Sequence, residues 1–315
     1  MKKQVSSRYD LRDNISRPSK IKLALAALLS LGNSKSKIRN IKKIGPYLLY
    51  KKINKENGFN NYFVGIYKKG NKKYFIKTWR GRMKDYHYQA LVNELIANKD
   101  LHNKLLKGKV RTPGIVEYFS ALDSLSVVYE YIEGKTLFSF PLIRQTKVVS
   151  YIIKYLHELG LEVGYYKHLT VLEKRDKKFY FYSLFYVTLL SLITSPKEYK
   201  LIIKAYMSAL FKLFHVNNRK LTINHCDLDL TNILISKNKY YLVDCGRLAI
   251  TLPEYDLTDI SLNPSFSKLS KKISKLIGIQ INQFLKIYLS LQYLKLQDPK
   301  TKNFNYLDNL KELLK

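Results

Sequence analysis

The sequence is poor in cysteine, in acidic residues and in apolar runs long enough to span a membrane. Its 315 residues include two cysteines, which excludes a disulfide framework and a four-ligand zinc site. Cys226 and Cys245 are expected to be reduced packing residues, with a redox-sensing role as the alternative. The first apolar run, Ile21 to Leu31, is too short to cross a bilayer and lacks a cleavage-like end, so no signal peptide is expected. A second stretch, Phe179 to Pro196, carries no charge and predicts a buried helix, with membrane insertion as the alternative.

The shortage of acidic residues gives the chain a strongly positive charge. There are 56 lysines and arginines against 24 acidic residues, a net charge of +32. Such a balance favours anionic partners: a nucleotide, a membrane surface, an acidic glycan or a nucleic acid. Compositional bias toward lysine, isoleucine, asparagine and tyrosine is the competing explanation. Residues 1–40 are read as a basic segment, in which a helix from Lys20 to Leu31 either binds a surface or packs on the folded body.

The pattern of apolar residues predicts a β-rich part followed by a helical part. Strands are expected at 47–53, 62–68, 73–78, 116–121 and 126–131, with a helix at 86–106 between the third and the fourth. Helices are then expected at 146–159 (ended by Gly160), 179–194 and 201–216. The segment after Gly246 is expected to be mixed and loop-like until Ser267, and the later helices break at Asp298-Pro299. The predicted division is 1–40, a first lobe 41–131 and a second lobe 132–315, with a hinge near 130–134.

The most informative part of the chain is the strip from His225 to Gly246. Asp227 precedes Asn232 by five residues, and Asp244 follows Asn232 by twelve. Between Asn232 and Asp244, two short apolar strands flank a polar turn, which predicts a β-hairpin with the polar residues at one end. Phosphoryl transfer needs such groups: a carboxylate to orient the attacking hydroxyl, and hard oxygen ligands for Mg²⁺. The competing interpretation is a hairpin with polar residues at its rim.

Taken in order, these motifs resemble the protein-kinase-like fold. A strand-borne Lys77 and a helix-borne Glu94 precede the apolar strand and turn at 127–134, and His225-Cys226-Asp227-Leu228 follows. About 90 residues separate the turn from Asp227. That spacing, the Asn232-Ile233-Leu234 triplet and the later Tyr255-Asp256-Leu257 are similar to the aminoglycoside phosphotransferase, choline kinase and lipopolysaccharide kinase branch. The resemblance implies an α+β, bilobal fold with a small β-rich N-lobe holding one long helix and a larger, mainly helical C-lobe.

The resemblance also implies a role for each matched residue in a transferase that uses ATP and Mg²⁺. Lys77 would bind the α- and β-phosphates while paired with Glu94; Lys72, Lys73 and Glu56 are the competing residues. Backbone groups of Glu130 and Ile132 would bond the adenine edge, and Tyr129 would line that pocket. Asp227 would orient the acceptor hydroxyl, and Asn232 and Asp244 would hold the metal. His225 would brace the loop.

Two departures from the pattern affect the phosphate contacts. The sequence has no Gly-x-Gly-x-x-Gly motif, and residues 58–65 are the only candidate for a glycine-rich loop. Asp229 stands where protein kinases place a lysine, and its charge would either repel the γ-phosphate or contact the acceptor.

The acceptor is expected to be a hydroxyl of a small molecule or glycan. The charge of +32 disfavours polycationic aminoglycosides, although Glu254, Asp256 and Asp259 form an acidic group. The basic first segment suits an acceptor at an anionic membrane, such as a lipopolysaccharide-type sugar, and hence a cytoplasmic protein at the inner face of the membrane. Two other hypotheses remain: a non-catalytic kinase-like binding module, and a nucleic-acid-associated protein whose tyrosines stack on bases.

Overall fold

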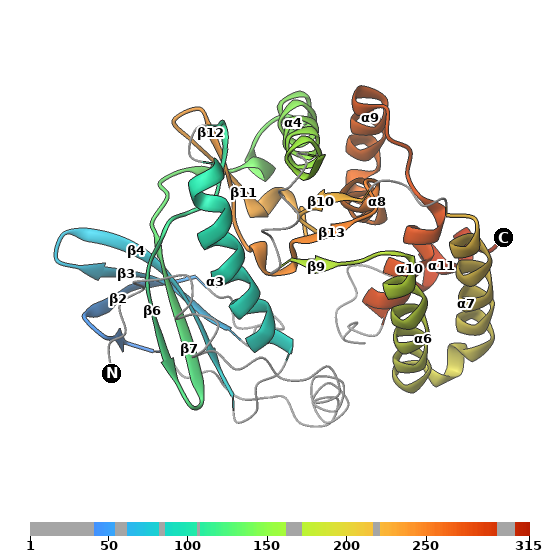
Figure 1. The fold of residues 1–315 in the computed structure, drawn as a ribbon, viewed down its shortest axis with the longest axis horizontal. Helices are drawn as coiled ribbons and strands as arrows, with labels where there is room; N and C mark the ends of the chain where they lie inside the picture. The colour runs from blue at the N-terminus through green and yellow to red at the C-terminus, as the bar shows by residue number, and fades with distance from the viewer. Residues whose placement is uncertain are drawn as a thin grey trace. The chain divides into compact units, whose positions relative to one another are not determined.

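The structure is a computed structural model that describes residues 41–53, 62–81, 86–105, 108–161, 172–216, 221–294 and 306–315. The chain forms two compact units (Figure 1). Unit 1 consists of the described residues of Met1–Lys135 together with Leu234–Arg247, and unit 2 of those of Thr136–Ile233 and Leu248–Lys315. Each unit combines two separate segments of the sequence, whereas the predicted lobes, 41–131 and 132–315, are continuous. The predicted boundaries stay a prediction.

Unit 1 is built on a six-stranded antiparallel sheet in the order β1-β2-β3-β4-β7-β6. Its strands are β1 (Lys43–Ile44), β2 (Tyr47–Lys52), β3 (Tyr62–Lys69), β4 (Lys72–Arg80), β6 (Ile115–Ala121) and β7 (Ser124–Glu130). A tight turn at Gly70, with φ of 59°, joins β3 to β4. The helix α3 (Tyr86–Leu105) follows β4. The strands predicted in this region and the helix after them are therefore confirmed, with β1 in addition.

The two faces of this sheet pack differently because side chains alternate along β4. Phe75 and Trp79 point to the face covered by α3, where they pack with Tyr88, Leu91 and Leu95 of that helix. Tyr74 and Ile76 point to the other face and join a separate cluster with Tyr47, Phe63 and Tyr67. Lys77 shares the parity of Phe75 and Trp79, so it points toward α3.

A second sheet of unit 1 contains the predicted hairpin. Its order is β5-β12-β11-β8, from β5 (Val110–Arg111), β12 (Lys239–Leu242), β11 (Ile233–Ser236) and β8 (Lys135–Thr136). The turn between β11 and β12 has positive φ at Lys237 and Asn238, 45° and 60°. Positive φ at both central residues is the geometry of the tight hairpin turn whose twist matches that of its strands.

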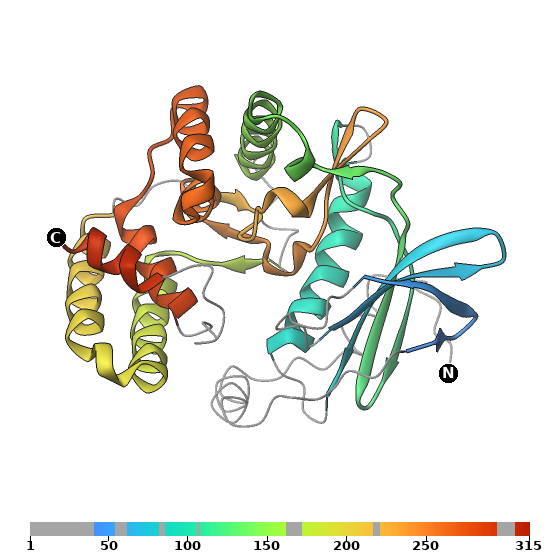
Figure 2. The ribbon, with the colours of Figure 1, turned by 180° about the vertical axis from the view of Figure 1, so that it is seen from behind.

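Unit 2 is mainly helical. Its helices are α4 (Leu142–Leu161), α6 (Lys177–Thr194), α7 (Tyr199–Phe214), α8 (Tyr255–Leu262), α9 (Ser267–Ile277), α10 (Gln283–Leu294) and α11 (Tyr306–Leu313). One small sheet, in the order β10-β13-β9, adds β10 (Thr222–Asn224), β13 (Ala249–Thr251) and β9 (Glu173–Lys174). Seen from behind, α6 and α7 lie side by side in this unit (Figure 2), and Tyr180 of α6 is hydrogen-bonded to Thr251 of β13 at 2.5 Å.

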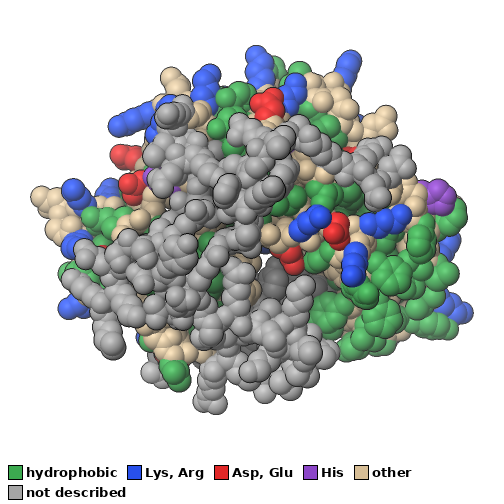
Figure 3. All heavy atoms as spheres, in the orientation of Figure 1, with side chains coloured by type: hydrophobic (Ala, Val, Ile, Leu, Met, Phe, Trp, Pro, Cys, Tyr) green, Lys and Arg blue, Asp and Glu red, His purple; other side chains and the backbone are tan. Residues whose placement is uncertain are grey.

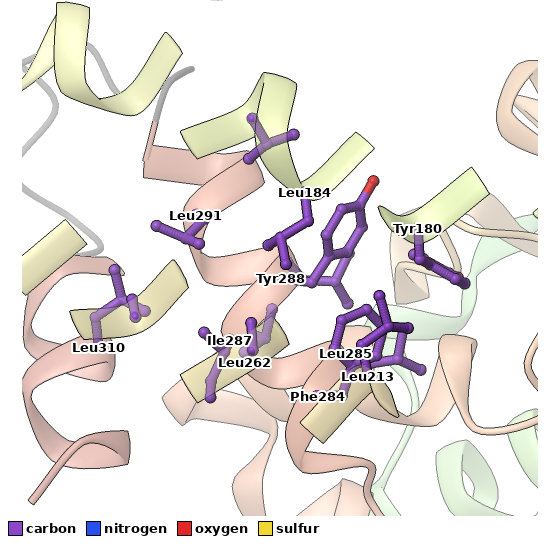
Figure 4. Packing of buried hydrophobic residues seen from close by; sticks show 14 of the residues in the cluster. Tyr180, Leu184, Leu213, Leu262, Phe284, Leu285, Ile287, Tyr288, Leu291 and Leu310 are labelled. Atoms are coloured by element: carbon purple, nitrogen blue, oxygen red, sulfur yellow. The ribbon is translucent and has the colours of Figure 1, made fainter. Parts of the chain in front are cut away.

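The core of unit 2 is formed by the inner sides of α6, α7 and α10. Tyr180 and Leu184 of α6 meet Leu285 and Tyr288 of α10 within one buried cluster (Figure 4). Tyr180 and Tyr288 pack edge to face at 5.1 Å between ring centroids. The uncharged stretch at 179–194 is thus a helix with a buried side, as predicted, but it is not buried all round, since five of its apolar side chains are exposed.

Three predictions of local structure in unit 2 need correction. Gly160 does not end its helix, because α4 extends through it to Leu161. The segment after Gly246 is not loop: β13 and α8 lie in it. α8 has only eight residues and six of them are buried, so it lacks the apolar–polar alternation that marks a surface helix. The predicted helix at 20–31 and the break at 298–299 lie outside the described residues.

Within the described ranges, no single helix has both the length and the apolar character to cross a membrane. Two consecutive segments, Lys177–Thr194 and Pro196–Phe214, are long and apolar enough when taken together, but the chain bends by 117° at the break between them.

Candidate active site

Lys77, Glu94 and Asp244, which are far apart in sequence, come together in unit 1. The Lys77 ammonium lies 2.9 Å from Glu94 Oε2 and 2.7 Å from Asp244 Oδ1. Lys77 and Glu94 are 6% and 3% exposed, whereas the Asp244 side chain is 47% exposed. The structure therefore distinguishes Lys77 from its predicted competitors Lys72 and Lys73, which are exposed on the same strand. Glu56, the third competitor, lies outside the described residues.

The two carboxylates determine the charge state of the lysine. Burial by itself lowers the pKa of Lys77, but Glu94 and Asp244 outweigh burial and raise it above its ordinary value. Burial raises the pKa of Glu94, and the attraction of Lys77 opposes that rise. The result is a cation held between two anions, one buried and one partly open to solvent.

Asp244 is presented by an unusual backbone. Its φ of 60° lies in the left-handed region, and the short 3-10 helix η4 (Cys245–Arg247) begins at the next residue. η4 packs so closely on α3 that a Cβ atom at Gly246 would lie 2.8 Å from the Ala90 carbonyl oxygen. Glycine after Asp244-Cys245 is therefore a steric requirement of this packing.

Two tyrosines surround the ion-pair group. The Tyr62 ring lies 4.4 Å from the Lys77 nitrogen, and its hydroxyl donates to the His87 carbonyl at 2.6 Å. Tyr129 is buried beside Glu94, and burial, reinforced by the Glu94 charge, raises the pKa of its phenol. Tyr129, on strand β7, is thus a buried neighbour of Glu94, and its place in an adenine pocket stays a prediction.

The predicted adenine-binding groups follow the end of β7. The backbone N–H of Glu130 donates to the Gly114 carbonyl at 2.8 Å, so this N–H is already used within unit 1. The Glu130 carboxylate in turn accepts from the Gly114 N–H at 3.3 Å. Ile132 is half-buried in the segment between β7 and β8. Their contact with a nucleotide stays a prediction.

Asp227 belongs to unit 2, where it follows strand β10. The loop that carries it is tied down by Asp256 at the start of α8: the carboxylate accepts from the backbone N–H of His225 at 2.9 Å and of Cys226 at 2.7 Å. These two bonds hold Cys226 in a left-handed conformation with φ of 60°. Asp227 itself is half-buried. These bonds use only the backbone of His225, so the bracing role expected of its side chain stays a prediction.

Asp256 is the functional residue that sequence reasoning missed. The sequence analysis named it in Tyr255-Asp256-Leu257 and in the acidic group with Glu254 and Asp259, without giving it a role. The signal that could have found it is an acidic residue among apolar ones. It is 1% exposed. Burial raises the pKa of its carboxyl, while His225 and the two backbone N–H groups oppose the rise.

Replacing Asp256 by asparagine should loosen the Asp227 loop. The amide can accept only through one oxygen, which leaves a buried N–H group without its partner and costs about 1–3 kcal/mol. We expect urea unfolding to show this loss, with turnover reduced more than ATP affinity. Asp308→Asn is the matched control, since its bond to Lys311 is exposed and worth less than about 1 kcal/mol. Equal effects of the two substitutions would contradict the bracing role.

Asn232 and Asp229 both stabilise the turn after Asp227. The Asn232 amide donates to the Asp227 carbonyl at 2.9 Å, across the 3-10 helix η3 (Leu230–Asn232). The Asp229 carboxylate caps η3 by accepting from the Thr231 N–H and hydroxyl, both at 2.7 Å. Asp229 therefore has a structural role, which neither of the two predicted alternatives, phosphate repulsion or acceptor contact, had included.

The donor set suits magnesium when phosphate is present. No cluster of three or more His, Cys, Asp or Glu side chains that could hold a metal ion occurs in the described part of the chain. Mg²⁺ is usually held by one or two carboxylates together with phosphate oxygens and water. Asp244 fits this requirement, because its partly exposed carboxylate is a hard oxygen donor. The part of Asn232, which belongs to unit 2, as a metal ligand stays a prediction.

Comparison with solved structures identifies the fold. A spectinomycin phosphotransferase in complex with ADP and spectinomycin is 16% identical, with 84% of this chain and 87% of that chain covered and a TM-score of 0.55. A streptomycin–ATP complex of APH(2")-IIa is 13% identical, with 95% and 97% covered and a TM-score of 0.55. Aminoglycoside phosphotransferase APH(4)-Ia is 9% identical, with 92% and 98% covered and a TM-score of 0.59. Neither a protein-family model nor a curated protein sequence matches this chain.

The chain thus has the fold of the aminoglycoside phosphotransferases. This confirms the α+β fold class predicted from the sequence, with a β-rich unit holding one long helix and a larger, mainly helical unit. Identities of 9% to 16% establish the fold and leave the activity to be argued from the residues.

Proposed function

We propose that this protein is an ATP-dependent phosphotransferase that phosphorylates a hydroxyl group of a small molecule or glycan. The observation that carries the proposal is the buried lysine held between a buried and a half-exposed carboxylate, Lys77 with Glu94 and Asp244. A buried ion pair is costly to maintain, and replacing it by apolar residues is often neutral or stabilising. Its presence therefore favours a functional role over a structural one.

Unit 1 would bind the triphosphate. Lys77 carries a fixed positive charge because its pKa is raised, which suits it to the α- and β-phosphate oxygens. Glu94 holds the ammonium in place, and Asp244 would hold Mg²⁺ through its exposed oxygen. When bound, the metal would neutralise charge on the phosphates.

Unit 2 would position the acceptor. Asp227, on a loop fixed by Asp256, would accept the proton of the attacking hydroxyl as its oxygen bonds to the γ-phosphorus. The bond from that phosphorus to the bridging oxygen of ATP breaks at the same time. The products are a phosphate monoester and ADP. The Asn232 amide donates to the Asp227 carbonyl and would thereby hold the backbone conformation of the loop.

The acceptor proposed here differs in charge from those in the neighbouring structures. Two of them contain spectinomycin and streptomycin, and aminoglycosides are cationic. A chain with a net charge of +32 repels such acceptors at long range and attracts anionic ones. We therefore favour a neutral or acidic sugar, including a lipopolysaccharide-type sugar reached by a cytoplasmic protein at the inner face of the membrane.

A transfer assay with γ-labelled ATP tests both parts of this proposal. The full-length protein should label an acidic or neutral glycan fraction at a higher kcat/KM than spectinomycin, streptomycin or gentamicin. Higher kcat/KM for an aminoglycoside would contradict the acceptor class but not the reaction. Release of neither labelled product nor ADP with any acceptor or with water would contradict the reaction itself.

A further inference from the structure

Helices α6 and α7 carry two apolar stripes each, and only one stripe per helix is used in the core. The inner stripes belong to the buried cluster of unit 2 through Tyr180 and Leu184 of α6 and through Ile202, Ala205 and Ala209 of α7. A helix that has already buried one apolar stripe normally turns polar residues to solvent on its other side.

The outer stripes break that rule. On α6 they consist of Phe181, Tyr182, Phe185, Leu189 and Ile193, and on α7 of Tyr199, Ile203, Met207, Phe211 and Phe214. Most of these residues follow one another at intervals of four, so they lie on one side of each helix. Their exposed fractions run from 44% to 66%. Figure 3 shows hydrophobic side chains gathered at the right, over the part of unit 2 where Figure 1 places α6 and α7.

The exposed apolar area is large for a monomeric protein. A buried aromatic side chain accounts for roughly 150–250 Å². Ten large side chains that are about half exposed therefore present on the order of 1,000 Å², whereas the largest patch on a typical monomer is about 300–600 Å². A face of this size calls for a partner.

The charges beside this face identify the partner. Between Lys177 and Phe214 there are six lysines and one acidic residue, Glu198. Two of the lysines lie at aromatic rings of the face: Lys177 is 5.7 Å from the Phe214 ring, and Lys200 is 5.9 Å from the Tyr199 ring. Lys177 also donates to the Phe214 carbonyl at 3.0 Å. An apolar face with lysines and tyrosines at its margin matches the boundary between lipid tails and anionic headgroups.

We propose that the outer face of α6 and α7 docks on the surface of an anionic lipid bilayer. The aromatic and aliphatic side chains would enter the interface while the lysines contact the headgroups. The helices would lie on the membrane without crossing it, because their inner stripes remain in the protein core. A second copy of the chain is the less favoured occupant, because the same lysines and a net charge of +32 on each copy oppose pairing.

Sedimentation with vesicles tests this inference on the full-length protein. The wild-type protein should sediment with vesicles of phosphatidylcholine and phosphatidylglycerol in equal parts, and much less with phosphatidylcholine alone. Phe185→Ser combined with Phe211→Ser should weaken binding to the mixed vesicles by about tenfold or more, since both are large aromatic side chains that are more than half exposed on their stripes.

A control double variant removes two apolar residues elsewhere that are at least as exposed. Leu122→Ser with Ile143→Ser, at 97% and 68% exposed, should bind the vesicles as the wild-type protein does. Equal loss in both double variants, or no binding by the wild-type protein, would overturn the proposal. It would also be overturned by a dimer in light scattering that dissociates in the Phe185–Phe211 variant while vesicle binding is unchanged.

Depth-dependent quenching gives a second readout that does not depend on folding of a weakened variant. The only tryptophan, Trp79, is 1% exposed in unit 1 and supplies the background emission. Phe211→Trp should be quenched by brominated lipid in mixed vesicles, while the wild-type protein is not. Absence of extra quenching in a variant that sediments with the vesicles would show that another surface makes the contact.

Discussion

The Asp227→Asn variant should bind Mg·ATP as the wild-type protein does and lose nearly all phosphoryl transfer. The amide has the shape of the carboxylate but does not accept the proton of the attacking hydroxyl. General-base catalysis contributes roughly 10²–10⁴-fold to a rate, so kcat should fall by about that factor. The loop should keep its position because Asp256 binds the backbone of His225 and Cys226 and makes no use of the Asp227 side chain. ADP release at saturating ATP and acceptor measures the effect.

Asp229→Asn is the matched control for this result. The two carboxylates are two residues apart, but that of Asp229 caps η3 through Thr231. Losing part of a helix cap costs about 1 kcal/mol of stability. The kcat of Asp229→Asn should therefore stay within a small factor of the wild-type kcat. If Asp229→Asn abolished transfer and Asp227→Asn did not, the roles assigned to the two residues would be reversed.

The Lys77→Met variant should lose both ATP binding and stability. Removing one partner of a buried ion pair typically costs about 3–5 kcal/mol, because the other charge is left without compensation. Here the stranded group is Glu94, which is 3% exposed. Urea unfolding measures the loss, and equilibrium titration with Mg·ATP measures the binding. Lys73→Met, at the exposed start of the same strand, is the control and should change neither the stability nor the ATP affinity by much.

The penalty in Lys77→Met should depend on pH with a definite sign. Burial already raises the pKa of Glu94, and loss of Lys77 removes the attraction that opposes the rise. An acid whose pKa is raised in the folded state stabilises the fold at low pH and loses that contribution as pH rises through the raised value. The variant should therefore be closer to wild type at pH 5 than at pH 8. Adding Glu94→Gln should recover stability; a further loss would contradict the pairing.

The sequence predicted the parts of the fold and site that depend on local pattern. Alternating apolar residues identified the strands on both sides of Lys77, and the spacing of Asp227, Asn232 and Asp244 identified the hairpin. The order of the motifs was enough to select Lys77 and Glu94, which the structure joins at 2.9 Å. These features were predictable because the periodicity of a helix or strand and the residues of a turn are determined by short stretches of sequence.

What the sequence did not reveal depends on tertiary contacts. Asp256 is distinguished by the two N–H groups that it holds 30 or more residues away. The short helix α8 is buried on most sides and has no periodic signal. The outer face of α6 was misread as core because an uncharged stretch looks the same whether a neighbour covers one side of the helix or both.

Titration of the full-length wild-type protein with ATP, in Mg²⁺ and again in EDTA, tests the proposed enzyme most directly. Saturable binding of one ATP per chain, weakened by EDTA and lost in Lys77→Met but kept in Asp227→Asn, is the predicted result. ATP that fails to bind in Mg²⁺, or binds equally well to Lys77→Met, would contradict the assignment of Lys77, Glu94 and Asp244 to the triphosphate.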